Sequence, residues 1–289
     1  MLVVRHHLAE NTVFRRFDAD VTARRFNTVL IVWLCFTFFF LLFPILGIAI
    51  MSFNSSKYGA LPFDFTTKWY AELFRSADLI SATWYSLWFS LLVSLCAAVL
   101  GIMASLALRR MSRKWNRAFP TLMNVPVIIP WLVQAVALLL LFNYLGIGKS
   151  FASLFFGCLV AVMPHSFLIT YSRIMTMDKY PEEASRTLGA SPLRILWEVT
   201  LPMIFPAVLS GFLMSFVLCF NCFSIQYYLA PFGTYTLPML IYTKIRAGYN
   251  PDINAIATLL TIAIAVVIFI MNRVGFDAGQ LVGQGHKEK

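Results

Sequence analysis

The chain has 289 residues, of which 60% are hydrophobic and only 12% are charged, and its mean hydropathy is +0.76. This composition excludes an ordinary soluble domain and predicts a protein embedded in a lipid bilayer. The net charge of +10 does not indicate nucleic-acid binding, because the basic residues gather at the ends of apolar segments and not along one helix face. We therefore expect membrane lipids, and no nucleic acid, as partners.

The first apolar run follows a polar, arginine-containing leader at residues 1–28, which we expect to stay in the cytoplasm. Residues 28–51 are too many for the core of a signal peptide and lack a small-residue cleavage site, so they predict a retained first span. An outer loop at 52–79 follows. Within it, Thr67 is placed to cap a short helix that carries Trp69 and lies along the membrane surface.

The second uncharged run, residues 79–108, is followed at once by basic residues with no acidic residue among them: Arg109, Arg110, Arg113, Lys114 and Arg117. Such a cluster marks the cytoplasmic end of a span. Residues 118–148 are again uncharged, but prolines interrupt their first part. We expect a third span that enters kinked and straightens after Trp131.

The remaining apolar runs predict a fourth span that ends near Arg173, a fifth at about 205–229 and a sixth at about 253–271. A solvated tail follows at 273–289. With both termini inside, most of the 23 lysines and arginines fall on the cytoplasmic side. The prediction is an all-α, polytopic membrane protein with six transmembrane helices, N-in and C-in, whose transmembrane domain covers residues 29–272.

The longest polar island between two spans is residues 173–202, which we call the elbow loop. Gly189 can adopt the left-handed conformation that closes a helix, and Ser191 followed by Pro192 can cap and open the next one. The loop therefore predicts two short helices that meet at a turn. The alternative is an ordinary cytosolic linker made of the same helix pair.

The spacing in the elbow loop resembles the EAA signature of ABC importer permeases, Glu-Ala-Ala, three residues, Gly, nine residues, Ile-x-Leu-Pro. Here Ser185 replaces the third residue and Val199 replaces the isoleucine. The resemblance implies that the loop forms coupling helices that dock into a groove of a cytoplasmic ATPase. The residues implied in that docking are Glu183, Ala184, Gly189, Ala190, Ser191, Pro192, Leu193, Leu201 and Pro202.

Most of the chain is also similar to the spermidine/putrescine branch of the binding-protein-dependent (MetI-like, type I) permeases. The likeness lies in 53–59, 65–70, 171–173, 237–242 and 254–258. It implies a sister permease as heterodimer partner, two copies of an ATPase subunit, a periplasmic binding protein, and a bacterial inner membrane. ATP and Mg would be bound by the ATPase: this sequence lacks a phosphate-binding loop and any catalytic set, so no cofactor and no enzyme activity are expected of it.

Four polar residues at membrane depth are candidates for the substrate path: His165, Asn221, Gln226 and Tyr227. Hydrogen bonds inside the helix bundle are the alternative for His165, Asn221 and Gln226. Cys219 and Cys222 have a redox-like spacing but lie in a span, which favours packing. No other cysteine pattern indicates a disulfide or a metal site.

The sequence has no Asp or Glu between Asp78 and Asp178 or between Glu198 and Asp252. The resemblance to polyamine importers implies consecutive acidic residues near the middle of span five, so the chain departs from that pattern. Two cargoes therefore stay open, a polyamine-like solute or a less cationic one such as an amino acid derivative. A stand-alone secondary transporter or channel, or a membrane scaffold, is the rival in another class. The transporter or channel would also leave the elbow loop unexplained.

Overall fold

The computed structural model describes residues 28–56, 63–248 and 252–273, and these are helical apart from short connections and one bridge between Asn54 and Phe65. The predicted leader and tail lie almost wholly outside the described residues. The chain divides into two compact units. One comprises residues 1–71 and 251–263, and the other comprises residues 72–250 and 264–289.

In the first unit, the helix Thr28–Met51 matches the predicted first span, and its apolar side chains are exposed along most of its length. After it, Phe53 stacks on Phe65 with ring centroids 5.5 Å apart. The helix α2 (Lys68–Arg75) begins where a surface helix was expected. Trp69, however, is buried, and its indole N–H donates a 2.7 Å hydrogen bond to the carbonyl of Asn54. Trp69 therefore anchors the loop to α2, and its side chain is not available to contact the membrane surface.

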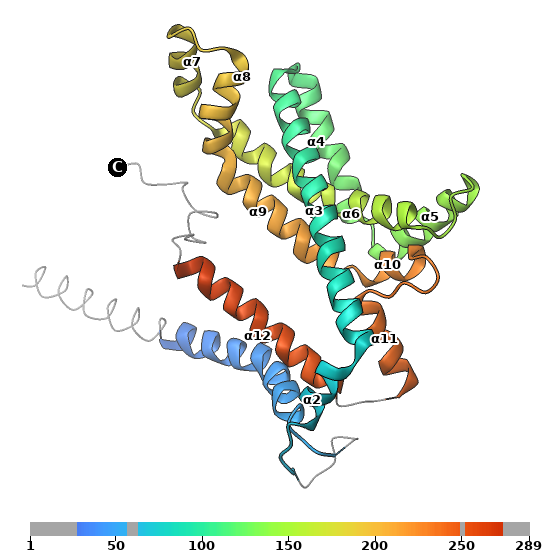
Figure 1. Ribbon diagram of the computed structural model, residues 1–289. Coiled ribbons are helices and arrows are strands. Elements are labelled where there is room, and N and C mark those ends of the chain that lie inside the picture. Colours follow the sequence, from blue (N-terminus) through green and yellow to red (C-terminus); the bar gives the residue numbers. More distant parts are fainter. Residues whose placement is uncertain (1–27, 57–62, 249–251, 274–289) are drawn as a thin grey trace, which may run out of the picture. The chain divides into compact units, whose positions relative to one another are not determined.

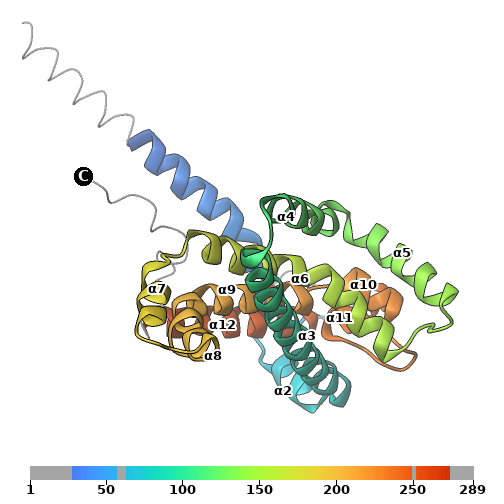
Figure 2. The ribbon, with the colours of Figure 1, turned by 90° about the horizontal axis from the view of Figure 1, so that it is seen from above.

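Three long helices, α3 (Ala77–Arg110), α6 (Phe151–Thr176) and α9 (Leu201–Phe220), cross and pack against one another in the second unit (Figures 1 and 2). They approach closely at Ser166 of α6. A Cβ atom on Gly101 would lie 3.1 Å from the Phe167 nitrogen, and one on Gly211 would lie 3.1 Å from the Ser166 Cα. Only glycine permits these backbone approaches from both sides of one α6 turn.

The predicted third span is broken into α4 (Arg113–Ile128) and α5 (Trp131–Tyr144), which meet at an angle of 100°. Of the three prolines that were expected to interrupt the first part, Pro120 and Pro126 lie inside α4, and the bend comes at the third, Pro130. The break falls at Ile129 and Pro130, both of which are extended. Proline lacks an amide hydrogen and holds the residue before it away from helical angles, so Pro130 ends α4.

The structure also differs from the prediction at the fifth span. The second arm of the elbow loop, α8 (Pro192–Ile195), continues through a π-helical turn, η1 (Leu196–Thr200), directly into α9. The helix then breaks at Asn221 and Cys222, and α10 (Phe223–Leu229) and α11 (Leu237–Ala247) follow. The interval 205–229 is therefore two helices, not one continuous span.

Among the described residues, four helices are long and apolar enough to cross a membrane, or five if the bent pair α4 and α5 crosses as one. The helix α12 (Asp252–Arg273) covers the predicted last span. Its first part, Asp252–Ala263, is apolar but shorter than the four helices counted as candidate spans. The all-helical expectation is thus confirmed for the described part of the chain. The number of spans established by length and composition is four to five.

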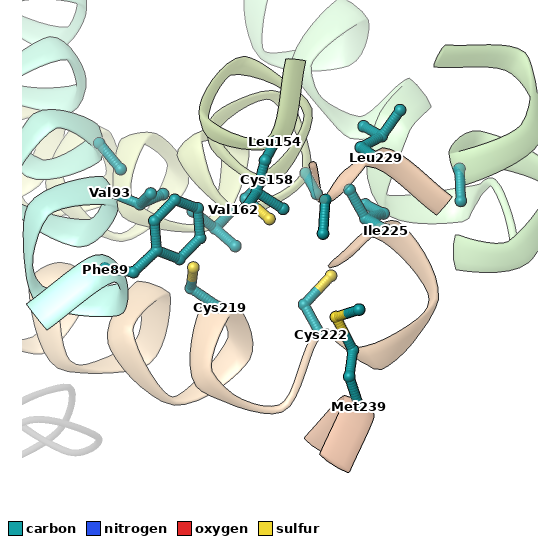
Figure 3. Packing of buried hydrophobic residues seen from close by; sticks show 14 of the residues in the cluster. Phe89, Val93, Leu154, Cys158, Val162, Cys219, Cys222, Ile225, Leu229 and Met239 are labelled. Atoms are coloured by element: carbon teal, nitrogen blue, oxygen red, sulfur yellow. The ribbon is translucent and has the colours of Figure 1, made fainter. Parts of the chain in front are cut away.

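The main core lies around the break after α9 (Figure 3). Phe89 and Val93 of α3 face Cys158 of α6, and Cys219 and Cys222 flank the break itself. These three cysteines are buried, and all five cysteines of the chain are free thiols. Cys219 and Cys222 therefore act as small packing residues in this core, which the apolar surroundings favour.

Candidate functional site

The elbow loop contains the predicted turn. The first arm, α7 (Tyr180–Thr187), ends in a Schellman motif: Ala190 N–H donates to the Ser185 carbonyl at 3.0 Å, and Gly189 N–H donates to the Arg186 carbonyl at 2.9 Å. Gly189 has φ +83°, the left-handed region that favours glycine.

The second arm begins as the sequence predicts. The side chain of Ser191 accepts a 3.4 Å hydrogen bond from Arg194 N–H, and Pro192 occupies the first helical position. The two arms are therefore set by local chemistry on both sides of the turn.

Large apolar side chains project from both arms. Leu188 is 87% exposed, Leu193 is 68% exposed and Trp197 is 67% exposed. Among the predicted docking residues, Glu183, Ala184, Ser191, Pro192 and Pro202 are exposed as well, whereas Ala190 and Leu201 are half-buried. Exposed apolar groups concentrated on one short polar loop form a candidate docking surface.

The buried acidic residue in the described part of this loop is Glu182, which the sequence analysis missed. Its Oε1 atom accepts a hydrogen bond from Arg109 Nη1 at 2.7 Å and another from Thr200 Oγ1 at 2.7 Å. We call Arg109, Glu182 and Thr200 the clasp. Glu182 is buried although it follows Pro181 at the exposed start of α7. Its neighbour Glu183, which carries the motif, points to solvent.

Burial of Glu182 would by itself raise its pKa, but hydrogen bonds from Arg109 and Thr200 and the charges of Arg109 and Arg186 hold its pKa below the usual value. The carboxylate is therefore ionised near neutral pH. A partial signal was present in the sequence: Arg109 is the first residue after a long uncharged run, so it is the member of the basic cluster closest to the apolar span, where a buried cation is stabilised by an acidic partner.

Gln226, a predicted path residue, is fully buried. Its Nε2 donates a 2.7 Å hydrogen bond to the Cys219 carbonyl, and its Oε1 accepts a 2.6 Å hydrogen bond from Thr236 Oγ1. Cys219 lies next to the break between α9 and α10, whereas Thr236 directly precedes α11. Gln226 thus forms hydrogen bonds inside the helix bundle, which was the alternative to a role in the substrate path.

Asn221 and Tyr227 are placed differently. Asn221 follows the last residue of α9, is exposed, and donates from Nδ2 to the Val217 carbonyl at 2.9 Å. Tyr227 is 42% exposed, and its ring centroid lies 5.2 Å from that of Phe223 and 5.7 Å from that of Tyr242. We call Phe223, Tyr227 and Tyr242 the aromatic cluster.

A cation borders the aromatic cluster. The guanidinium carbon of Arg246 lies 5.1 Å from the Tyr242 ring centroid, and Arg246 Nε donates to the Tyr242 hydroxyl at 2.8 Å. His165, the fourth predicted path residue, is half-buried in the interior of α6, on a separate helix. Among the described residues, no group of three or more His, Cys, Asp or Glu side chains is placed to hold a metal ion.

Comparison with known proteins gives four further findings. Residues 97–275 match the profile of the family described as binding-protein-dependent transport system inner membrane component. The putrescine transport system permease protein PotI of Escherichia coli (strain K12) is 34% identical over 266 residues, which cover 90% of this chain and 92% of PotI.

The spermidine/putrescine transport system permease protein PotC of the same organism is 32% identical over 238 residues, or 82% of this chain and 90% of PotC. In fold, the chain is similar to a bacterial ABC transporter involved in the import of the acidic polysaccharide alginate. The TM-score is 0.70 at 18% identity, and the match covers 90% of this chain and 98% of the other.

Proposed function

Since the chain belongs to the family of binding-protein-dependent transport system inner membrane components and is a permease subunit of an ABC importer, we propose that its elbow loop docks onto a partner ATPase. We further propose that its membrane helices move a small polyamine-like solute inward by alternating access. ATP and Mg are then bound by the ATPase, and this chain supplies the path and the mechanical link.

The observation that carries the docking proposal is the geometry of the elbow loop. Gly189 sets a tight turn between two short arms, and Leu188, Leu193 and Trp197 extend from these arms into solvent. Because η1 joins the second arm to α9 without a loop, a displacement of the arm is passed to a long membrane helix. Rigid-body transmission of this kind is a common route for switching between two states.

The membrane arrangement is part of the same proposal. Six spans with both termini in the cytoplasm of a bacterium would place the elbow loop and the cationic end of α3 together on the inner side, and both lie at one end of the second unit in Figure 1. A transmembrane domain over residues 29–272, a sister permease, two ATPase copies and a periplasmic binding protein complete the assembly. The inner membrane is the only bilayer in which these partners meet.

A polyamine-like cargo is the first candidate, because PotI and PotC are named for putrescine and spermidine. Asn221 and the half-exposed Tyr227 offer an amide and an aromatic face to a small ammonium group. A specific observation favours a second candidate, an amino acid derivative or another less cationic solute. Arg246 places a positive charge on the aromatic cluster, and the sequence has no Asp or Glu between Glu198 and Asp252 to offset it.

Coexpression with the sister permease, the ATPase and the binding protein tests the proposal. The ATPase should copurify, and its turnover should rise when binding protein loaded with putrescine is added. Leu193→Asp, which places a charge on the docking surface, should abolish copurification. Phe232→Asp is the matched control, since Phe232 is 91% exposed in the turn between α10 and α11. Retained ATPase with Leu193→Asp would contradict docking through the elbow loop.

A further inference from the structure

We propose that Glu182 is a positioning residue that makes the elbow loop and the adjoining ends of α3 and α9 move as one body, so that the clasp couples ATP hydrolysis to transport. The inference rests on the proposed function, because it assumes that the elbow loop receives the movement of an ATPase. It adds a specific device to that function. The exposed Glu183 carries the family motif, whereas the buried Glu182 makes the internal connection.

The clasp joins three elements through a single oxygen atom. Arg109 lies in the last turn of α3, Glu182 lies in the first turn of α7, and Thr200 is the last residue of η1, directly before α9. Both donors approach Oε1 of Glu182 at 2.7 Å. Short hydrogen bonds to an ionised acceptor are stronger than neutral ones and hold their groups in a fixed geometry.

Little else connects α3 with α7. A hollow of about 450 Å³ lies between the end of α3 and the elbow loop, lined on one side by Leu106 and Ala107 and on the other by Pro192 and Leu196. In the described chain, α3 packs mainly on α6 and α9, while α7 packs on α8 and η1. The Arg109–Glu182 ion pair therefore bridges a gap that side-chain packing does not fill.

The contact made by Thr200 also sets it apart from nearby hydroxyl groups. Thr176 and Thr187 donate to carbonyls of their own helices three or four residues back, the usual local partners of threonine. Thr200 instead donates across 18 residues of sequence to Glu182. One carboxylate thus holds the first arm of the elbow loop to the residue at which the second arm becomes a membrane helix.

A second ion pair in the same loop provides an internal contrast. The Nε atom of Arg194 lies 2.9 Å from Oε2 of Glu198, but the two residues are only four positions apart on one helical segment. Their side chains are 67% and 60% exposed. That pair links no separate elements, and exposed pairs of this kind contribute little. In the clasp, by contrast, the side chain of Arg109 is 17% exposed and that of Glu182 is 10% exposed. If ion pairs in this loop matter only through charge, the two pairs should respond alike to mutation.

The test uses the complete importer, with both permeases, the ATPase and the binding protein, reconstituted in lipid vesicles. Radiolabelled putrescine taken up per ATP hydrolysed is measured for wild type, Glu182→Gln and Arg109→Gln. Copurification of the ATPase and the melting temperature are recorded for each variant. Glu198→Gln and Arg110→Gln are the matched controls, because each removes the same charge from a neighbouring exposed residue.

We expect Glu182→Gln and Arg109→Gln to retain the ATPase and hydrolyse ATP, while uptake per ATP falls about tenfold, which corresponds to about 1.4 kcal/mol of lost coupling free energy. The controls should keep the wild-type ratio. The charge-exchanged double variant Arg109→Glu/Glu182→Arg should recover much of it, which a general loss of stability would not allow. Thr200→Val, which leaves the ion pair intact, should reduce the ratio less and keeps the test available if a charge variant does not fold.

Wild-type uptake per ATP in the Glu182→Gln and Arg109→Gln proteins would overturn the clasp and leave the proposed function standing. So would a double variant no better than either single one. If the wild-type chain neither retains the ATPase nor supports uptake, the proposed function itself fails and the clasp falls with it. The two failures are therefore separated by the wild-type measurement.

Discussion

Gln226 and Thr236 form a buried hydrogen bond of 2.6 Å that ties α10 to the turn before α11. The other end of the same amide donates to the Cys219 carbonyl, which the break after α9 leaves without its normal helical partner. One residue farther along, Leu237 N–H donates to Ser86 Oγ of α3 at 2.7 Å. A broken helix is tolerated in an apolar core when its freed groups are bonded again in this way.

Gln226→Leu should therefore destabilise the chain. The substitution keeps the approximate size of the side chain but leaves the buried Thr236 hydroxyl without its acceptor, at about 1–3 kcal/mol. It also leaves the Cys219 carbonyl with the Cys222 N–H as a donor, at 3.1 Å. Thermal denaturation in detergent should report a clearly lower melting temperature. Asn221→Leu is the control, because Asn221 is exposed and caps only its own helix. Equal melting temperatures for the two variants would contradict a structural role for Gln226.

The close approach of α3, α6 and α9 predicts a strong effect of volume at Gly211. A Cβ atom there would lie 3.0–3.1 Å from Ser166 atoms, including its backbone, so Gly211→Val must force α9 away from α6. Overpacking of this kind costs about 1–3 kcal/mol. Gly47→Val is the matched control, since no atom lies within 4 Å of a Cβ on that helical glycine. The melting temperature should fall for Gly211→Val alone.

Gly189 predicts a backbone effect without any clash. Its φ is +83° and no atom lies within 4 Å of an added Cβ, so Gly189→Val strains the turn by about 1 kcal/mol or more through its backbone alone. Gly189→Asn should be tolerated better, because asparagine enters the left-handed region more readily. Putrescine uptake should be lost with valine and largely kept with asparagine. Full uptake with valine would show that the elbow loop is only a linker.

The clasp predicts a defined pH dependence. Because the folded-state pKa of Glu182 is lowered, its contribution to stability is complete above the unfolded-state pKa and is lost as the pH falls through the folded-state value. The difference in melting temperature between wild type and Glu182→Gln should be constant from pH 8 down to about 5 and should shrink below about 4. A difference that grows on acidification would contradict an ionised clasp.

Local patterns predicted much of this fold correctly. Composition and run length gave the helix Thr28–Met51, and the order of Gly189, Ser191 and Pro192 gave the turn of the elbow loop, because each depends on neighbours in sequence. The break at Asn221 and Cys222 was not visible, since the hydrogen bonds that compensate for it come from Gln226 and Thr236. Two adjacent glutamates on a helix point in different directions. Which of them, Glu182 or Glu183, forms the buried ion pair therefore depends on where α3 places Arg109.

Asn221 is the residue best placed to test what the path selects. It is exposed at the end of α9, two residues before the aromatic cluster begins, and its amide is uncharged where the polyamine relatives were expected to carry acidic groups. A positively charged solute in a low-dielectric path is stabilised by a nearby carboxylate, because an uncompensated charge there costs several kcal/mol. Asn221→Asp supplies such a carboxylate with almost no change in shape.

If Asn221 faces the path, Asn221→Asp should shift uptake toward more cationic solutes. Competition between spermidine and a zwitterionic amino acid derivative, measured with the importer in lipid vesicles, should move several-fold in favour of spermidine, since about 1.4 kcal/mol of added attraction changes the preference tenfold. Asn143→Asp, at an exposed position near the end of α5, is the control for added charge alone. An unchanged preference in a folded Asn221→Asp protein would assign Asn221 to capping α9 and leave Tyr227 and the aromatic cluster as the remaining candidates for contact with the solute.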